Sequence, residues 1–340
     1  MVMSMAHGHD GWVSGAWAPS GDGTPGGDGT AGRDGTAGSG RATELFRYVY
    51  RPREPVLESP RPYFHPVRTL GGDLVSLYRP HDHVWHKGIA WSLCNVGPAN
   101  FWGGPTYTRD GGYRQLDNNG RIRHEGFTTL DVCDQVLRID ERLSWVTQPG
   151  ETWIEEQRRI RVAVLPGCAL GGLGGSSPRG EHSAWQLGFG TAMRNVTGHV
   201  IKIGSPTTEG RANAGYSGLF WRGPRSFSGG TVLTPDGPGG DELMGWRGPW
   251  LGYAGRHDGH GRASTLVFCD HPENFSAPSQ WFVRTGMYAC VCPAPFFSRE
   301  YPLEPGQTLE LGYDVLVADG ELDAARCAEL AGQVALGAHR

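Results

Sequence analysis

The sequence predicts an all-β protein, a large antiparallel β-sandwich with one C-terminal α-helix. About a dozen and a half short segments between residues 44 and 318 alternate apolar and polar residues, as strands with one buried face do. Turns rich in glycine, proline and aspartate separate these segments, and helical periodicity occurs only after residue 320. Many short strands joined by turns are typical of a β-sandwich.

The chain divides into three parts. Residues 20–40 read SGDGTPGGDGTAGRDGTAGSG and repeat the triplet Asp-Gly-Thr amid glycine. Because such a segment has almost no apolar surface to bury, residues 1–42 are predicted to form a disordered tail. Residues 43–320 are predicted to form the β-sandwich domain, and residues 321–340 the helix and a short tail.

Three segments show the alternation most clearly. They are RRIRVAVLP (158–166), WQLGFGTAM (185–193) and TLELGYDVLVADG (308–320). Successive side chains of a strand point to opposite faces, so the apolar residues of each segment share one face. These residues are Ile160, Val162 and Val164; Trp185, Leu187, Phe189 and Met193; and Leu309, Leu311, Tyr313, Val315 and Val317.

The helix is predicted in ELDAARCAELAGQVAL, residues 321–336. Its apolar residues recur at helical spacing and form one stripe, and Asp319 is a candidate N-cap. The stripe consists of Leu322, Ala325, Cys327, Leu330 and Val334.

Composition excludes several classes of protein. A net charge of −4 and a pI near 6.3 give no basic surface for nucleic acid. No apolar run of about 18 residues occurs, so no membrane-spanning helix is expected. The first residues lack a signal-peptide pattern, and seven cysteines follow no disulfide spacing. We therefore expect a cytoplasmic protein with reduced thiols, and a homo-oligomer is compatible with these observations.

The stretch RPHDHVWHKG (79–88) concentrates three of the 13 histidines. In a strand, His81 and His83 would point the same way, and a turn through Val84 and Trp85 would bring His86 back toward them. Three interpretations remain open: an acid/base site that contacts a sugar, a metal site, and a partly structural role. Other candidate metal ligands, His124-Glu125, Glu209 and His271, lie far along the chain.

A second stretch, SPTTEGRANAGYSGLFWRGPRSF (205–227), combines aromatic, acidic and basic residues with glycines. Carbohydrate sites favour this mixture, because aromatic rings stack on sugars while arginine and glutamate form charged hydrogen bonds. The alternative is a loop of buried tryptophans with arginines that extend to solvent.

These motifs resemble the bacterial PmoA-like domain family, often labelled methane oxygenase PmoA. The resemblance covers about residues 44–320, and the label implies a metal-dependent oxygenase. The family is commonly encoded near sugar oxidoreductases and isomerases, and its sandwich is similar to the galactose mutarotase-type supersandwich, which holds sugars on a concave sheet face. The matching pieces are RPYFHPVRT (61–69), DHVWHKGIAWS (82–92), NFWGG (100–104), SPTTEGR (205–211), GYSGLFWRGPRSF (215–227), LMGWRGPWLGY (243–253), DHPENF (270–275) and WFVR (281–284).

We therefore predict a carbohydrate-active protein that transfers a proton on a sugar or oxidised-sugar ring, by epimerisation, elimination or hydrolysis. A metal-dependent oxygenase and a non-catalytic glycan-binding domain are the alternatives, and the cofactor is expected to be either none or a divalent metal. The predicted catalytic residues are His81, His86, Glu209 and Asp82, with Glu125 as an alternative partner for the imidazole. The predicted substrate-binding residues are Arg68, His83, Trp102, Glu125, Arg211, Tyr216, Trp221, Arg222 and Arg284.

Overall fold

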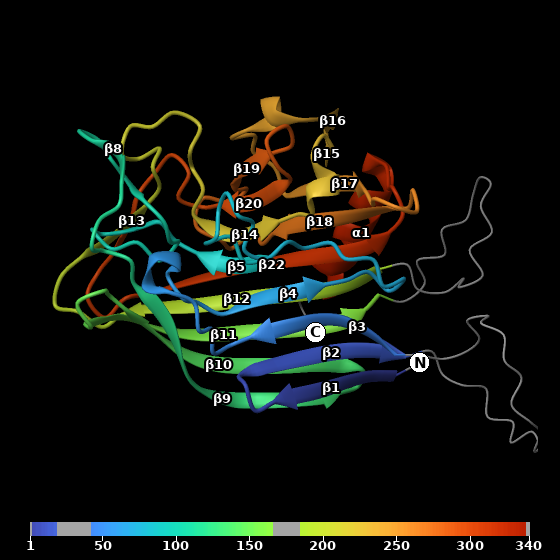
Figure 1. The fold of residues 1–340 in the computed structure, drawn as a ribbon, viewed down its shortest axis with the longest axis horizontal. Coiled ribbons are helices and arrows are strands. Elements are labelled where there is room, and N and C mark those ends of the chain that lie inside the picture. Colours follow the sequence, from blue (N-terminus) through green and yellow to red (C-terminus); the bar gives the residue numbers. More distant parts are fainter. Residues whose placement is uncertain (1, 19–41, 166–183, 338–340) are drawn as a thin grey trace, which may run out of the picture.

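The computed structural model of the chain describes residues 2–18, 42–165 and 184–337. Two large antiparallel sheets pack face to face, and Figure 1 shows them with the helix at one end. The eight-stranded sheet has the order β1 (Val2–Gly8), β2 (Trp12–Ala18), β3 (Thr43–Val49), β4 (Tyr63–Val67), β5 (Ile89–Ser92), β14 (Gly218–Arg222), β20 (Cys290–Ala294) and β19 (Gln280–Arg284).

The nine-stranded sheet contains the longest strands. Its order is β16 (Gly237–Gly239), β15 (Thr231–Thr234), β17 (Trp250–Arg256), β18 (Ala263–Asp270), β22 (Thr308–Asp319), β12 (Ala184–Asn195), β11 (Thr152–Val164), β10 (Val136–Val146) and β9 (Arg121–Cys133). The smaller elements are β6 (Asn95–Val96), β13 (Ile201–Gly204), β21 (Tyr301–Leu303), β7 (Thr106–Thr108), β8 (Gly112–Arg114), and the 3₁₀ turns η1 (Val56–Glu58), η2 (Arg225–Phe227) and η3 (Asp241–Leu243).

The three predicted strand segments lie side by side at the centre of the nine-stranded sheet. Ile160 on β11 pairs with Phe189 on β12, and Phe189 pairs with Tyr313 on β22. All three side chains are buried in the main core between the sheets. The predicted antiparallel sandwich with one C-terminal helix is therefore confirmed.

The main core contains large aromatic side chains, and the indole nitrogens of two of its tryptophans are hydrogen-bonded to backbone carbonyls. The indole nitrogen of Trp221 donates to the carbonyl oxygen of Val75 at 2.7 Å, and that of Trp281 donates to Gly248 at 2.9 Å. Trp221 has no exposed surface, so it is a core residue and not a face on which a sugar can stack.

A network of buried charges also lies between the sheets. Arg158 forms an ion pair with Glu156, and the Arg158 guanidinium donates to the Tyr48 hydroxyl at 3.1 Å. The Tyr48 hydroxyl donates to Glu141, which also contacts the His124 imidazole at 2.6 Å. The network links the two sheets, and each of its charged groups has a partner, so no isolated ion is buried.

The predicted disordered tail is wrong for residues 2–18. These residues form the hairpin β1–β2, which extends the eight-stranded sheet through pairing of β2 with β3. Met3 and Val13 are buried in the main core, because the short alternating segments on either side of the turn supply apolar surface. Residues 19–41, which carry the Asp-Gly-Thr repeats, lie outside the described residues.

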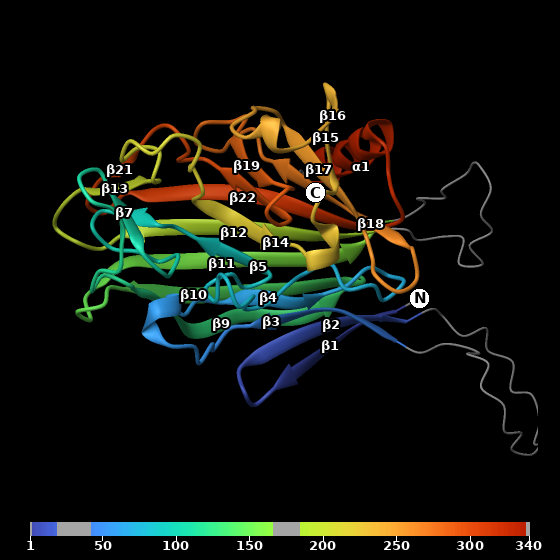
Figure 2. The same cartoon turned by 45° about the horizontal axis from the view of Figure 1, so that its top comes forward.

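Helix α1 (Ala324–Gly337) packs on the outer face of the nine-stranded sheet, beside β17 and β18 (Figure 2). Cys327, Leu330 and Val334 are buried there, as the predicted stripe requires, whereas Ala325 is exposed. The N-cap is Asp323 and not Asp319: the Asp323 carboxylate accepts the backbone N–H of Arg326 at 2.9 Å. No helix in the described part of the chain is long and apolar enough to cross a membrane.

Candidate functional site

The candidate site lies on the outer face of the eight-stranded sheet, where β5, β14, β20 and β19 are neighbours. Strand β14 alternates, so that Leu219 and Trp221 enter the main core while Phe220 belongs to a second apolar cluster. Phe282 on β19 and Cys292 on β20 belong to the same cluster. Since Arg222 follows Trp221, it shares the outer face with Phe220.

Residues 79–88, called the histidine segment below, cover this face as two consecutive turns. The His83 N–H donates to Pro80 at 3.0 Å, and the His86 N–H donates to the His83 carbonyl at 2.9 Å. The predicted strand geometry, with His81 and His83 on one strand face, is therefore wrong, because Pro80 begins a turn instead. The predicted return of His86 through Val84 and Trp85 is confirmed, since the His83 and His86 rings stack at 4.7 Å.

Arg222 is the central charged group of the site. Its guanidinium contacts Nδ1 of His86 at 3.2 Å and the Asp82 carboxylate at 3.5 Å, and it lies 3.7 Å over the ring of Tyr288. Only 1% of the residue is exposed, and its Nε atom is buried without a hydrogen-bond partner among the described residues. Burial lowers the pKa of Arg222. This cation is incompletely neutralised.

Asp82 is the carboxylate that several of these groups share. It accepts from His83 at 2.9 Å and from Arg225 at 3.0 Å, and Arg225 also contacts Nδ1 of His81 at 3.0 Å. Partial burial opposes ionisation of Asp82, but the hydrogen bonds from His83 and Arg225 and the charge of Arg222 hold its pKa well below the usual range. Asp82 is therefore an anion throughout the physiological pH range.

His86 is held in its neutral form. Burial, followed by the positive charges near it, including Arg222 and Arg61, lowers its pKa well below the usual value. Because the Arg222 guanidinium can only donate, Nδ1 of His86 must accept, and the proton of the neutral ring lies on Nε2. His86 can thus donate a hydrogen bond to a ligand through Nε2.

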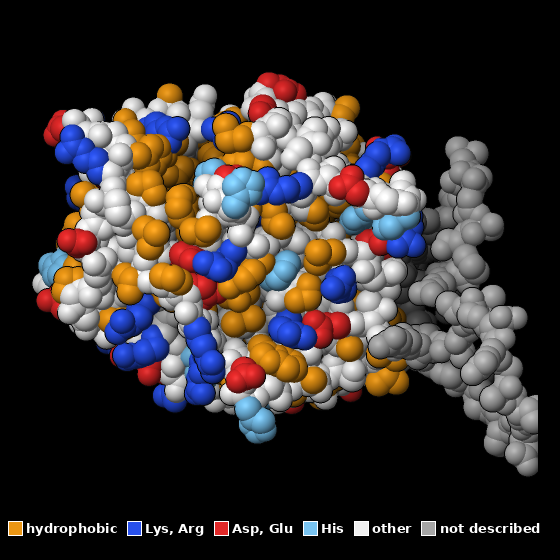
Figure 3. Space-filling model, viewed as in Figure 1, with side chains coloured by type: hydrophobic (Ala, Val, Ile, Leu, Met, Phe, Trp, Pro, Cys, Tyr) orange, Lys and Arg blue, Asp and Glu red, His pale blue; other side chains and the backbone are white. Residues whose placement is uncertain are grey.

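Aromatic side chains form one wall of the site. Trp102 lies 4.7 Å from Tyr216 and 4.8 Å from Phe220, measured between ring centroids, and its ring meets that of His86 edge-on at 6.0 Å. Figure 3 shows hydrophobic, histidine, arginine and acidic side chains gathered on the side of the molecule where Figure 1 shows β5, β14 and β20. At the edge of the wall, Arg211 lies 4.4 Å from the ring of Tyr113, whose hydroxyl bonds to that of Tyr216 at 2.7 Å.

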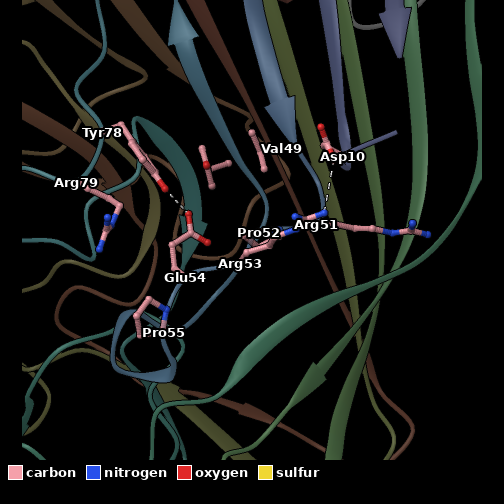
Figure 4. Close-up of a pocket in the computed structure, with 10 residues that line it drawn as sticks. Asp10, Val49, Arg51, Pro52, Arg53, Glu54, Pro55, Tyr78 and Arg79 are labelled. Carbon is pink, nitrogen blue, oxygen red and sulfur yellow. Dashed lines mark hydrogen bonds and ion pairs between the residues drawn. The ribbon is translucent and has the colours of Figure 1, made fainter. Parts of the chain in front are cut away.

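The start of the histidine segment lines a cavity of about 370 Å³ (Figure 4). The Tyr78 hydroxyl donates to Glu54 at 2.6 Å, and Tyr78 stacks on Tyr63 at 5.1 Å. Next to this cavity, Arg79 and Lys87 both bond to the buried carboxylate of Glu58. These contacts fix both ends of the histidine segment to the chain that precedes β4.

The structure brings together most, but not all, of the predicted site residues. His81, Asp82, His83, His86, Trp102, Tyr216 and Arg222 meet in one cluster, and Arg211 lies at its edge. Four other predicted residues make no hydrogen bond or ion pair to this cluster in the described residues: Glu209, Glu125, Arg68 and Arg284. Glu125 pairs with Arg123 instead, and Arg284 lies over the ring of Phe282.

The predicted site residues did not include Arg225, Tyr288 or Arg61. Arg225 stands three residues after Arg222, so the stretch 205–227 contained the signal. Tyr288 lies between β19 and β20 without a motif, and Arg61 reaches the site by donating to the Trp85 carbonyl at 2.8 Å. The Arg61–Trp85 contact joins residues more than 20 positions apart, and no local sequence pattern predicts it.

The cluster does not fit a metal ion. Nδ1 of His86 and Nδ1 of His81 each accept a hydrogen bond from a guanidinium group. A metal ion that bound the same nitrogen would have to displace that arginine. In the part of the chain that the structure describes, no group of three or more His, Cys, Asp or Glu residues has the geometry of a metal site. The oxygenase activity that the resemblance implied stays a prediction without support from this site.

The molecule is thus a β-sandwich with a cationic, aromatic-walled cluster on the outer face of one sheet. The chain belongs to the family described as "Family of unknown function (DUF6807)", which matches residues 39–332. No curated protein matches the chain. Among solved structures it is similar to a variant of the GH36 alpha-galactosidase AgaA from Geobacillus stearothermophilus in complex with raffinose, at 11% identity and a TM-score of 0.34 over 73% of this chain and 32% of that one. The chain covers about a third of that protein, and so distant a similarity supports no inference about function.

Proposed function

We propose that the protein binds an acidic sugar, such as a uronate, and transfers a proton at the carbon next to the sugar carboxylate. The observation that carries the proposal is Arg222, a buried guanidinium whose Nε has no partner among the described residues and whose nearest carboxylate lies 3.5 Å away. A ligand carboxylate would supply the anion that this group lacks.

The local charges favour an anionic ligand over a neutral one. Arg222 and Arg225 share the single carboxylate of Asp82, which also accepts from His83. Arg61, buried nearby, donates to backbone carbonyls and to a serine hydroxyl and has no ion-pair partner among the described residues. The excess positive charge lies beside partly exposed aromatic rings, such as that of Tyr288, which suits a sugar ring with one ionised group.

His83 is the group best suited to move the proton. Its Nδ1 lies 2.9 Å from the Asp82 carboxylate, which orients the ring, and its side chain is about one-third exposed. Its Nε2 is therefore the atom that exchanges a proton with the substrate. His86, neutral and hydrogen-bonded to Arg222, donates to the ligand instead of acting as the base.

This chemistry narrows the predicted reactions to epimerisation and elimination. In epimerisation the proton leaves the carbon and returns to the other face. In elimination it leaves together with the substituent on the neighbouring carbon. Both require an acidic C–H bond, which the adjacent carboxylate and the cation of Arg222 provide by stabilising negative charge in the transition state.

The test is hydrogen–deuterium exchange in heavy water, followed by proton NMR. D-Glucuronate and D-galacturonate are compared with D-glucose and D-galactose, which differ from them only at C6. We expect the C5 proton signal of an acidic sugar to disappear and the neutral sugars to be unchanged. Exchange in the neutral sugars, or none in any acidic sugar that binds, would refute the proposed reaction.

Two variants separate the roles of the residues. His83→Gln should bind the acidic sugar but exchange at least about a hundredfold more slowly, as expected on losing a general base. Arg222→Gln should weaken binding of the acidic sugar and leave neutral sugars unaffected. Arg123→Gln and His199→Gln, both exposed and outside the cluster, are the matched controls.

A non-catalytic glycan-binding role is the second candidate, favoured by the partly exposed ring of Tyr216, which packs on the buried ring of Trp102. Calorimetry distinguishes the two. The glycan-binding role is supported, and proton transfer excluded, if an acidic sugar binds without any exchange. In that case its affinity should be unchanged in His83→Gln and lost in Trp102→Ala.

A further inference from the structure

A second cavity lies beneath helix α1, on the other sheet. It has a volume of about 450 Å³, which is in the range of small-molecule sites. The first four residues (270–273) of the motif DHPENF, which the proposed function leaves unexplained, form one side of it together with Asp314 of β22. Trp250 and α1 residues such as Ala331 form the apolar side.

The polar centre of the cavity is an imidazole fixed by a buried carboxylate. Nε2 of His271 lies 2.7 Å from Oδ2 of Asp314, and the Gln186 amide donates to Oδ1 of the same carboxylate at 2.7 Å. The ring lies against Gly312, where any side chain would overlap Nδ1. Since the Asp314 carboxylate only accepts, the neutral imidazole carries its proton on Nε2 and leaves Nδ1 as an acceptor.

The turn that carries His271 is rigid. Both oxygens of the preceding Asp270 are occupied: one accepts from the Asn274 amide at 2.7 Å and the other from the Ser279 N–H at 2.7 Å. The Asn274 amide also bonds to the Gly312 carbonyl. The imidazole is thus held between β18 and β22 before any ligand arrives.

The described residues that line the cavity offer hydrogen-bond acceptors and no lysine or arginine. Nδ1 of His271 has no partner among the described residues, and the exposed carboxylate of Glu273 is not in an ion pair there. The apolar side of the cavity, from Trp250 and α1, suits a hydrocarbon or aromatic body.

We propose that this cavity binds a small organic amine, with the ammonium group donating to Nδ1 of His271 near Glu273 and the apolar body packed against Trp250 and α1. The ligand class is opposite in charge to the one proposed for the first site. The two proposals are independent of each other.

Binding should depend on pH in a defined direction. The charged groups that face His271 are Asp314 from β22, Asp270 from the end of β18 and Glu273 from the turn, while α1 contributes none of the described lining charges. The hydrogen bond to Asp314, followed by the neighbouring carboxylates, raises the pKa of His271. Because a proton on Nδ1 competes with the ammonium group, affinity should fall as the pH drops through this raised pKa.

The experiment titrates the full chain with benzylamine, benzyl alcohol and benzoate, which share one ring and differ in charge. Calorimetry at several pH values between about 5 and 8 gives the affinities. We expect benzylamine to bind about tenfold more tightly than benzyl alcohol at pH 8, benzoate not to bind, and the preference to shrink at pH 5.

Two variants assign the binding to this cavity. Ala331→Leu should fill the apolar side and abolish benzylamine binding, while His271→Gln should retain weak binding that no longer depends on pH. Arg123→Gln, exposed and outside both sites, is the control and should bind benzylamine as the unmodified chain does. Equal or tighter binding of benzoate, or benzylamine binding that survives Ala331→Leu unchanged, would overturn the proposal.

Discussion

Arg61 and Arg222 are both fully buried guanidinium groups, but their hydrogen bonds differ. Arg61 donates to Ser92 and to the carbonyl oxygens of Glu58, Ser59 and Trp85, so all of its nitrogens are engaged. Arg222 has one nitrogen without a partner in the described part of the chain and depends on a shared carboxylate. Arg61 therefore acts as a structural link between segments, whereas Arg222 retains capacity to bind an anion.

His86 predicts a specific loss of stability in acid. A histidine whose pKa is lower in the folded state binds its proton only after unfolding, so its stabilising contribution is present above about pH 6.5 and is lost as the pH falls. Fully buried His86 should contribute up to about 1.4 kcal/mol per pH unit to this loss.

Urea unfolding at several pH values between about 5 and 7.5 checks this, with the unmodified chain compared with His86→Phe. The variant should have a shallower decline of the free energy of unfolding. His65, whose pKa is lowered to about 4, mainly by burial, remains in both proteins and cancels in the difference. Identical slopes would mean that His86 is not held neutral by the fold.

At the scale of single residues, the sequence predicted the histidine cluster with Asp82 as a supporting group, and Glu209 or Glu125 as the acid/base partner of the imidazole. The turn through Val84 and Trp85 could be predicted because proline, aspartate and glycine flank it. In the structure the carboxylate that contacts an imidazole of the cluster is the neighbouring Asp82, while Glu209 and Glu125 make no hydrogen bond or ion pair to the cluster in the described residues. Distances between segments more than a hundred residues apart depend on the sheet order, which no local pattern contains.

Gly88 joins the histidine segment to β5 and has a conformation that few other residues adopt. Its φ is +67°, and a Cβ atom there would overlap the backbone carbonyl oxygen of Phe64 on β4. Gly88→Ala should therefore destabilise the protein by several kcal/mol, since both the conformation and the contact are unfavourable.

The matched control is Gly72→Ala. Gly72 also has a positive φ, +93°, but no atom lies within 4 Å of the place that a Cβ atom would take there. Its substitution should lower the free energy of unfolding by only about 1 kcal/mol, so the difference isolates the clash with β4. Equal losses in the two variants, measured by urea unfolding, would mean that the contact with Phe64 is unimportant.

Strands with one polar face were predictable, and strands buried on both faces were not. β12 alternates over its length, and β22 over its first half, because their outer faces carry glycine or polar residues at several positions. β5, with sequence IAWS, is buried at all four positions, and so is every residue of β14. A short, fully buried strand has no period to detect, so the site strands escaped prediction.

The N-terminal hairpin supplies two strands, β1 and β2, of the eight-stranded sheet. We therefore expect it to contribute to the stability of the whole molecule. Val13 on β2 is fully buried against the main core, whereas Ser4 on β1 is more accessible to solvent. Val13→Ala should lower the free energy of unfolding by about 2 kcal/mol, while Ser4→Ala should change it by less than about 0.5 kcal/mol. Thermal unfolding of both variants checks this, and equal melting temperatures would restore the view that residues 2–18 are dispensable.

The strand order of the eight-stranded sheet has a consequence for biosynthesis. β5, which ends at Ser92, pairs with β14, which begins at Gly218, and β14 pairs with β20 near residue 290. Because non-local pairing must await the later strand, the emerging chain carries β1–β5 with an unpaired edge until most of its length has been synthesised. Arg222 can meet His86 only after that edge closes, so the candidate site assembles late. A ribosome-bound chain stopped before residue 218 should expose this edge to chaperones.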